Sequence, residues 1–127
     1  MAGGVLIVED DEDIRADLAA ILSLKGFAVE QAANGLEALE RMRGGLPCVV
    51  LLDLMMPEMN GWELRAAMRS DLRMRDVPVV VVSGAGRLEE AAASLDAAAV
   101  LPKPFELAQL LELVARFCPQ LEVRAVR

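Results

Sequence analysis

The chain has 127 residues, enough for one domain with its own core and too few for two comfortable ones. Its composition, 55% hydrophobic and 26% charged, is typical of a globular protein and argues against disorder. The absence of His excludes His-based catalytic triads, His-ligated zinc and a histidine phosphocarrier role. A net charge of −7, no Tyr, three Phe and one Trp argue against nucleic acid and anionic membranes as partners.

The two cysteines and the N-terminus bear on the compartment of the protein. Cys48 and Cys118 are far apart and outside CxxC spacing, so we expect two buried free thiols in a reducing compartment. The N-terminus lacks a basic leader and reaches an acid after a short apolar run, so it is not a signal peptide. No stretch approaches the roughly 20 apolar residues of a membrane span. These features predict a cytoplasmic protein with no membrane contact.

Short apolar runs alternate with segments of helical spacing along the chain. The apolar runs predict five strands, at residues 5–8, 27–32, 48–53, 77–82 and 98–101. The intervening segments predict helices at residues 14–22, 36–44, 61–69, 88–96 and 107–117, the last one stopped by a proline. Strict alternation predicts an α/β fold: a doubly wound, five-stranded parallel sheet of strand order 2-1-3-4-5, with helices on both faces. We expect one domain over residues 1–119 and a short C-terminal tail over 120–127.

Carboxylates follow two of the expected strands. Glu9 and Asp10 come directly after the first strand, and Asp53 ends the third, which should be its neighbour in the sheet. Each like-charge pair at about 4 Å costs about 4 kcal/mol at an effective dielectric of about 20, so three ionised carboxylates need a cation. Oxygen ligands of this kind suit Mg²⁺, and Mn²⁺ would also fit. Alternatively, one acid is protonated, or a Lys or Arg neutralises the group.

A hydroxyl and a lysine follow the fourth and fifth strands. Ser83 ends the fourth, although Ser before Gly is by itself usually only a turn. Lys103 follows the fifth strand between two prolines, which restrict its backbone and make the Lys103–Pro104 bond a candidate for the cis form. Together with a metal and a nucleophilic Asp53, this inventory suits phosphoryl transfer to an aspartate.

At this point the sequence resembles the receiver domain of bacterial two-component response regulators, which has a flavodoxin-like fold. The resemblance covers residues 4–118, nearly the whole chain. Met1 favours a free-standing, single-domain protein, and a domain cut from a longer chain stays the alternative. It is carried by Glu9-Asp10, Leu51-Leu52-Asp53-Leu54-Met55-Met56-Pro57 with Gly61, Ser83 and Lys103-Pro104-Phe105.

The resemblance implies a role for each matching residue. Asp53 would accept a phosphoryl group from the phosphohistidine of a sensor histidine kinase or a histidine phosphotransfer protein. Asp10, Asp53 and the backbone carbonyl of Met55 would ligate Mg²⁺, and Glu9 would act mainly through a metal-bound water. The chain would then be no enzyme for other substrates, but would catalyse its own phosphorylation and slow dephosphorylation.

The same resemblance implies a switch. Lys103 would pair with Asp53 and then with the phosphoryl oxygens, and Ser83 would move to the phosphoryl group. Many receivers have an aromatic residue where this chain has Val100, so the aromatic part of the switch is in doubt. Output would then depend on movement of loops and of the expected fourth helix. The resemblance implies signalling by protein contact, through the surface of the expected fourth helix, fifth strand and last helix.

Several alternatives stay open. The acidic pair could align as Asp10 and Asp11, the latter otherwise read as a helix cap. A phosphatase of the haloacid dehalogenase type would need an Asp where Met55 stands, and a flavodoxin-like electron carrier would have its cofactor phosphate repelled by the acids. The chain could also be a binding module that is never phosphorylated, or a phosphate shuttle or sink.

Overall fold

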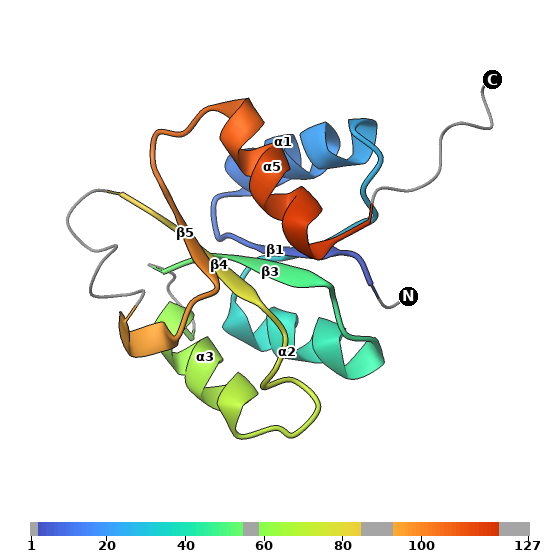
Figure 1. The fold of residues 1–127 in the computed structure, drawn as a ribbon. Coiled ribbons are helices and arrows are strands. Elements are labelled where there is room, and N and C mark those ends of the chain that lie inside the picture. Colours follow the sequence, from blue (N-terminus) through green and yellow to red (C-terminus); the bar gives the residue numbers. More distant parts are fainter. Residues whose placement is uncertain (1–2, 55–58, 85–92, 120–127) are drawn as a thin grey trace.

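Five parallel strands form one sheet in a computed structural model that describes residues 3–54, 59–84 and 93–119 (Figure 1). The strands are β1 (Val5–Val8), β2 (Val29–Ala32), β3 (Val49–Asp53), β4 (Val79–Ser83) and β5 (Ala99–Pro102). Their order in the sheet is β2-β1-β3-β4-β5, and every neighbouring pair is parallel. The fold predicted from the alternation of apolar runs and helical segments is therefore confirmed.

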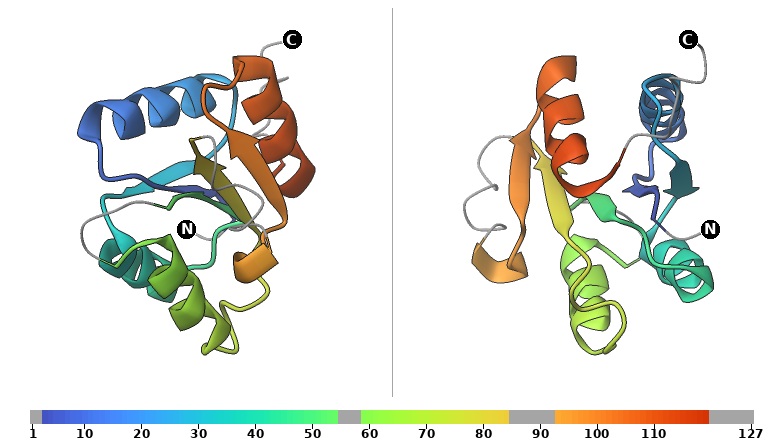
Figure 2. Two further views of the ribbon diagram at one scale, coloured as in Figure 1. Left: turned by 90° about the vertical axis from the view of Figure 1, so that its left-hand side faces the viewer. Right: turned by 45° about the vertical axis from the view of Figure 1, so that its right-hand side comes forward.

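Helices cover both faces of this sheet. α1 (Glu12–Leu24) and α5 (Leu107–Phe117) lie on one face, and α2 (Gly35–Gly44) and α3 (Gly61–Arg69) lie on the other (Figures 1 and 2). Residues 93–95 are also helical, and the rest of the helix expected at 88–96 falls largely outside the described residues. Within the part of the chain that is described, no helix has the length and apolar content to cross a membrane.

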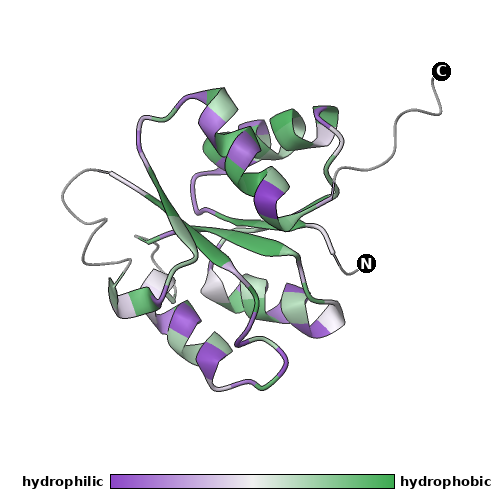
Figure 3. Ribbon diagram, in the orientation of Figure 1, coloured by the Kyte–Doolittle hydropathy of each residue, from purple (hydrophilic) through white to green (hydrophobic). Residues whose placement is uncertain are grey.

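The strands supply two cores, one under each pair of helices. Val5 and Ile7 pack toward α1 and α5, whereas Leu6 and Val8 pack toward α2 and α3. Each of the four is only 1% exposed, which is why β1 is a continuous apolar run rather than an alternating one. The central strands β1, β3 and β4 are accordingly almost entirely hydrophobic, and hydrophilic residues are found mainly on the helices and loops (Figure 3).

Some strands begin later than the apolar pattern predicts, because the first apolar residues close turns. The Phe27 N–H donates to the Leu22 carbonyl (3.0 Å) and completes the end of α1, so β2 begins only at Val29. The Val77 N–H donates to the Met74 carbonyl (3.0 Å), so β4 begins beyond it. Apolar side chains thus continue into the core past the limits of the sheet.

Short polar side chains fix where the helices begin. Asp11 caps α1 by accepting a hydrogen bond from the Ile14 N–H (3.0 Å). Asn34 caps α2, and Asn60 and Glu63 form a reciprocal capping box at the start of α3. The cap on α1 engages the Asp11 carboxylate in the helix, directly beside the acidic pair that precedes it.

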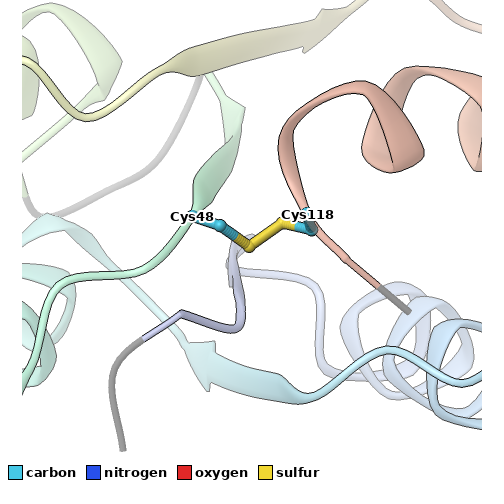
Figure 4. Close-up of a disulfide and its surroundings, with 2 residues drawn as sticks. All are labelled: Cys48 and Cys118. Atoms are coloured by element: carbon cyan, nitrogen blue, oxygen red, sulfur yellow. A yellow bond between two sulfur atoms is a disulfide. The ribbon is translucent and has the colours of Figure 1, made fainter. Parts of the chain in front are cut away.

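The prediction of two free thiols is wrong. Cys48 and Cys118, the two cysteines of the chain, form a disulfide with a Cα–Cα distance of 5.4 Å (Figure 4). They are 70 residues apart in sequence, and they meet because the end of α5 packs beside the start of β3. The spacing of the cysteines carried no sign of this pairing, since the pairing depends on how the last helix docks.

Candidate functional site

The carboxyl edge of the sheet brings three carboxylates together. Glu9 follows β1, Asp53 ends β3, and the register of Val8 with Leu52 places the two acids at the same level. With Asp10, they offer three carboxylate oxygens that all lie within 4.8 Å of one another. Glu9 is buried, Asp53 is half-buried and Asp10 is exposed, so the cluster opens to solvent on one side.

Glu9 is the most tightly held member of this cluster. One carboxylate oxygen accepts a hydrogen bond from the Asp11 N–H (3.1 Å), and the other lies 3.5 Å from Lys103 Nζ. Its backbone carbonyl accepts a hydrogen bond from the Arg15 guanidinium (2.8 Å). An ion pair with Lys103 and two hydrogen bonds thus fix both the side chain and the main chain of Glu9.

The surroundings of Glu9 favour its neutral form. Burial raises the pKa of Glu9 from 4.5 to about 7. The negative charge of Asp53, and a hydrogen bond between the two carboxyl groups, act in the same direction, while the Asp11 N–H and Lys103 act against it. Near neutral pH Glu9 is therefore only about half ionised, and a divalent cation bound to the cluster would favour its charged form.

An apolar wall explains why the charged form of Glu9 is poorly solvated. A cavity of about 30 Å³ lies against Glu9, Asp53 and Lys103. Its other lining residues are all apolar: Ile7, Val8, Ile14, Leu18, Leu51, Val82 and Phe105. Side chains from β1, β3, β4, α1 and the segment after β5 thus exclude water from one side of the carboxylates.

Ser83 and Lys103 lie on the two neighbouring strand ends. Ser83 is 5% exposed and pairs in register with Pro102, and its carbonyl accepts a hydrogen bond from the Lys103 N–H (2.9 Å). The Lys103–Pro104 peptide is cis, as the sequence allowed. The Lys103 ammonium is paired with Glu9, whereas the resemblance implied a pairing with Asp53, which stays a prediction.

The expectations for Met55 and Val100 have different outcomes. Met55 lies outside the described residues, so its proposed carbonyl ligand stays a prediction. Val100 is half-buried in β5 and packs against the core on the α2 and α3 side. No aromatic side chain occupies this position, in keeping with the departure noted in the sequence.

Arg15 is a residue of the site that the sequence reasoning missed. It lies on the first turns of α1 and hydrogen-bonds the main chain at the end of β1. The available signal was its place as the first basic residue after a run of acids. A basic side chain one helical turn beyond such a run can fold back toward the acids, but the sequence does not say which atom it meets.

The donor set suits a small, hard divalent cation. All three side-chain ligands are carboxylate oxygens, and their mutual spacing within 4.8 Å allows one ion to contact each of them. Mg²⁺ is bound through one or two carboxylates together with waters and a phosphate oxygen, and it prefers sites of this type to all-protein cages. The side of the cluster open to solvent leaves room for those additional ligands.

The fold and site together describe a doubly wound α/β domain with an acidic cluster at the carboxyl edge of its sheet. Residues 5–115 match the response regulator receiver domain family, so the chain belongs to that family. Receiver domains are the phosphoacceptor switches of two-component signalling and in general take phosphoryl groups from histidine kinases.

Curated relatives and solved structures agree with this assignment. Response regulator MprA of Mycobacterium sp. (strain KMS) is 40% identical over 109 residues, which cover 84% of this chain and 46% of that protein. MprA of Mycobacterium ulcerans is 40% identical over 113 residues, covering 87% of this chain and 48% of that protein. The chain spans about half the length of these curated relatives.

Two solved structures illustrate the match in three dimensions. The response regulator receiver protein from Pseudomonas putida has a TM-score of 0.82 and 29% identity, covering 91% of this chain and 98% of the other. The signal receiver domain of a signal transduction histidine kinase from Syntrophus aciditrophicus has a TM-score of 0.80 and 30% identity, covering 91% and 89%. The sheet order and helix placement therefore belong to receiver domains as a class.

Proposed function

We propose that Asp53 accepts a phosphoryl group from a phosphohistidine, carried by a sensor histidine kinase or a histidine phosphotransfer protein. An Asp53 carboxylate oxygen attacks phosphorus, and an O–P bond forms as the N–P bond breaks. The imidazole leaves with the electron pair of the broken bond and takes up a proton. The observation that carries this proposal is the convergence of three carboxylates within 4.8 Å, with Lys103 beside them.

We propose Mg²⁺ as the cofactor of this step, with Mn²⁺ as a substitute. Glu9, Asp10 and Asp53 would hold the ion, and the backbone carbonyl of Met55 would be a further ligand. The bound ion would neutralise negative charge on the carboxylates and on the incoming phosphoryl oxygens. Asp53 is the nucleophile because it ends β3 half-buried, level with the end of β1.

Lys103 and Ser83 respond to the new charge. Phosphorylation adds about −1.5 to −2 charge and three acceptor oxygens at Asp53. The ammonium group of Lys103 lies 3.5 Å from Glu9 and would move from this carboxylate to pair with the phosphoryl oxygens. The Ser83 hydroxyl would donate a hydrogen bond to the same oxygens. The domain would turn over no other substrate, and would catalyse only its own phosphorylation and slow dephosphorylation.

The output of this switch is proposed to be a change of protein-binding surface. Lys103 directly follows β5 and begins the segment that leads to α5, so movement of Lys103 would change the surface near β5 and α5. We propose a cytoplasmic protein that signals through protein contact. A shuttle or sink in a phosphorelay would use the same chemistry with a different recipient.

The test is intact mass after incubation with Mg²⁺ and acetyl phosphate, a small acyl phosphodonor. We expect the mass of one phosphoryl group to be added to the wild-type chain, and no addition without Mg²⁺ or in Asp53→Ala. Asp17→Asn is the matched control, because Asp17 is an exposed acid on α1, a turn beyond the acidic run, and should label like the wild type.

A folded, Mg²⁺-binding chain that takes up no phosphoryl group would contradict self-catalysed transfer. Repeating the incubation with a phosphorylated histidine phosphotransfer protein would then separate two cases. Labelling would show a strict need for a protein donor, and no labelling would favour a binding module that is never phosphorylated.

A further inference from the structure

The disulfide lies at the opposite end of the strands from the carboxylates, and β3 connects the two. Cys48 directly precedes β3, the strand that ends in Asp53, and its N–H donates to the Gly4 carbonyl (2.8 Å) next to β1. Along an extended strand the distance from Cys48 to Asp53 is about 17 Å. The disulfide is therefore remote from the phosphoacceptor, but it is continuous with it through one rigid strand.

The other half of the disulfide ends α5. The Cys118 N–H donates to the Val114 carbonyl (2.9 Å), and Leu110, Val114 and Cys118 are buried in the core on this side of the sheet. Lys103 and Phe105, which lie beside Glu9 and Asp53, belong to the segment that leads into α5, and Cys118 caps the other end of this helix. The Cys48–Cys118 disulfide thus holds the C-terminal end of α5, and the segment before the N-terminal end of α5 lies at the site.

The two sulfur atoms differ in how exposed their residues are. Cys118 is 4% exposed, whereas Cys48 is only partly buried. An external thiolate would therefore attack the Cys48 sulfur and release the Cys118 thiolate. Since the chain has no third cysteine, no internal thiol can divert the exchange.

We propose that Cys48 and Cys118 form a reversible thiol–disulfide site, which gives this domain a redox input in addition to phosphorylation. Its co-reactants are dithiols for reduction and small-molecule disulfides for oxidation. In reduction the Cys48–Cys118 bond takes up two electrons and two protons, and the dithiol becomes a cyclic disulfide. In oxidation by oxidised glutathione the two thiols form one disulfide, and two molecules of reduced glutathione leave.

Reversibility follows from the compartment, and this step rests on the proposed function. A domain that receives phosphoryl groups from a kinase in the cytoplasm works where thiols are kept reduced and disulfides form conditionally. In the disulfide-bonded domain the two Cα atoms lie 5.4 Å apart, within the usual 4.4–6.8 Å, so the bond fits the packing of α5 beside β3. Its closure state therefore changes how firmly the end of α5 is held.

The experiment follows the folded 127-residue chain through both redox states. The protein is treated with dithiothreitol, then with oxidised glutathione, and free thiols are counted by alkylation and intact mass while circular dichroism records the fold. We expect two thiols in the first state and none in the second, with the fold retained in both. Hydrogen exchange at the Cys118 amide and the last turn of α5 should be at least about tenfold faster in the reduced state.

Controls separate this proposal from the proposed function. Asp53→Ala should show the same thiol counts as the wild type, so a failure to phosphorylate leaves the redox result standing. The double variant Cys48→Ser, Cys118→Ser should exchange at the end of α5 like the reduced wild type and should not respond to either reagent.

Three outcomes would overturn the proposal. The first is a disulfide that resists dithiothreitol until urea unfolds the domain, since the bond would then be a permanent structural link. The second is loss of the fold without the disulfide, seen either when the wild type is reduced or in both the Cys118→Ser variant and the double variant. The third is identical exchange at the end of α5 in the two redox states.

Discussion

Replacing Glu9 by Gln removes a buried ionisable group while keeping its shape. The Gln side chain can still accept the Asp11 N–H, and it can donate to Asp53 in place of the carboxyl proton. What the variant loses is the ability to ionise in a place where the side chain is 7% exposed. Comparing its stability with that of the wild type across pH therefore isolates the cost of charging Glu9.

The sign and size of this cost follow from the pKa. Burial raises the pKa of Glu9 from 4.5 to about 7 in the folded domain, so folding takes up a proton between these values. The free energy of unfolding should therefore fall as pH rises from about 4.5 to about 7, and level off above that. The difference between the two pKa values corresponds to about 3 kcal/mol.

The assay is urea unfolding followed by far-UV circular dichroism, at a series of pH values with a metal chelator present. Wild type and Glu9→Gln should be similar near the acid end of the range, and the variant should be about 3 kcal/mol more stable near pH 8. Glu12→Gln serves as the matched control, because Glu12 is an exposed acid in the first turn of α1. Its profile should run parallel to that of the wild type.

Mg²⁺ gives the same prediction a second readout. If the ion displaces the proton on Glu9, adding Mg²⁺ at pH 8 should stabilise the wild type and recover much of the difference from Glu9→Gln. The reasoning would be refuted by parallel stability profiles for wild type and Glu9→Gln without metal. That result would mean that the carboxyl group is well solvated in the folded domain.

Three further substitutions test other parts of the structure by urea unfolding. Cys48→Ser removes a disulfide between residues 70 apart and should lower the free energy of unfolding by about 4 kcal/mol. A dithiol should have no added effect on this variant, and stability equal to that of the wild type would contradict the prediction. Gly35→Ala would place a Cβ 2.6 Å from the Met59 side chain and carbonyl, so it should cost about 1–3 kcal/mol and slow labelling by acetyl phosphate. Unchanged labelling would show that Met59 moves aside without disturbing the site. Arg65 is 6% exposed and donates a 2.9 Å hydrogen bond to the Leu95 carbonyl, so Arg65→Met should lower the free energy of unfolding by about 1–3 kcal/mol. A gain in stability would show that burying the charge costs more than this hydrogen bond contributes.

Apolar runs predicted the central strands well, because β1, β3 and β4 are buried on both faces, whereas β2 carries Glu30 and Gln31 and is more exposed. β1 was predicted without error, since its four side chains alternate between two cores and none can be polar. The starts of β2 and β4 were predicted too early, because Phe27 and Val77 are apolar for the sake of the core while their N–H groups close turns. Hydrophobicity reports burial, and the limits of a strand depend on where its hydrogen bonds go.

The site was predictable to the level of which residues meet, and less so to the level of which atoms pair. A parallel sheet places the residues after its strands at one edge, so Glu9, Asp10 and Asp53 had to converge. The pairing of Lys103 with Glu9 depends on side-chain geometry and burial, which a sequence pattern does not encode. The disulfide was missed for a similar reason, because it depends on the docking of α5 against β3.

Glu9 links the charge state of the site to the rest of the domain. Three groups can offset the negative charge at this edge: a proton on Glu9, the Lys103 ammonium and a divalent cation. Under the proposed function a phosphoryl group on Asp53 adds about −1.5 to −2 charge, so a proton on Glu9 no longer suffices and the two cations are drawn to the phosphoryl oxygens. Lys103 is the one of these three groups attached to β5 and the segment leading to α5, and its release from Glu9 is therefore the step that would carry the signal out of the site.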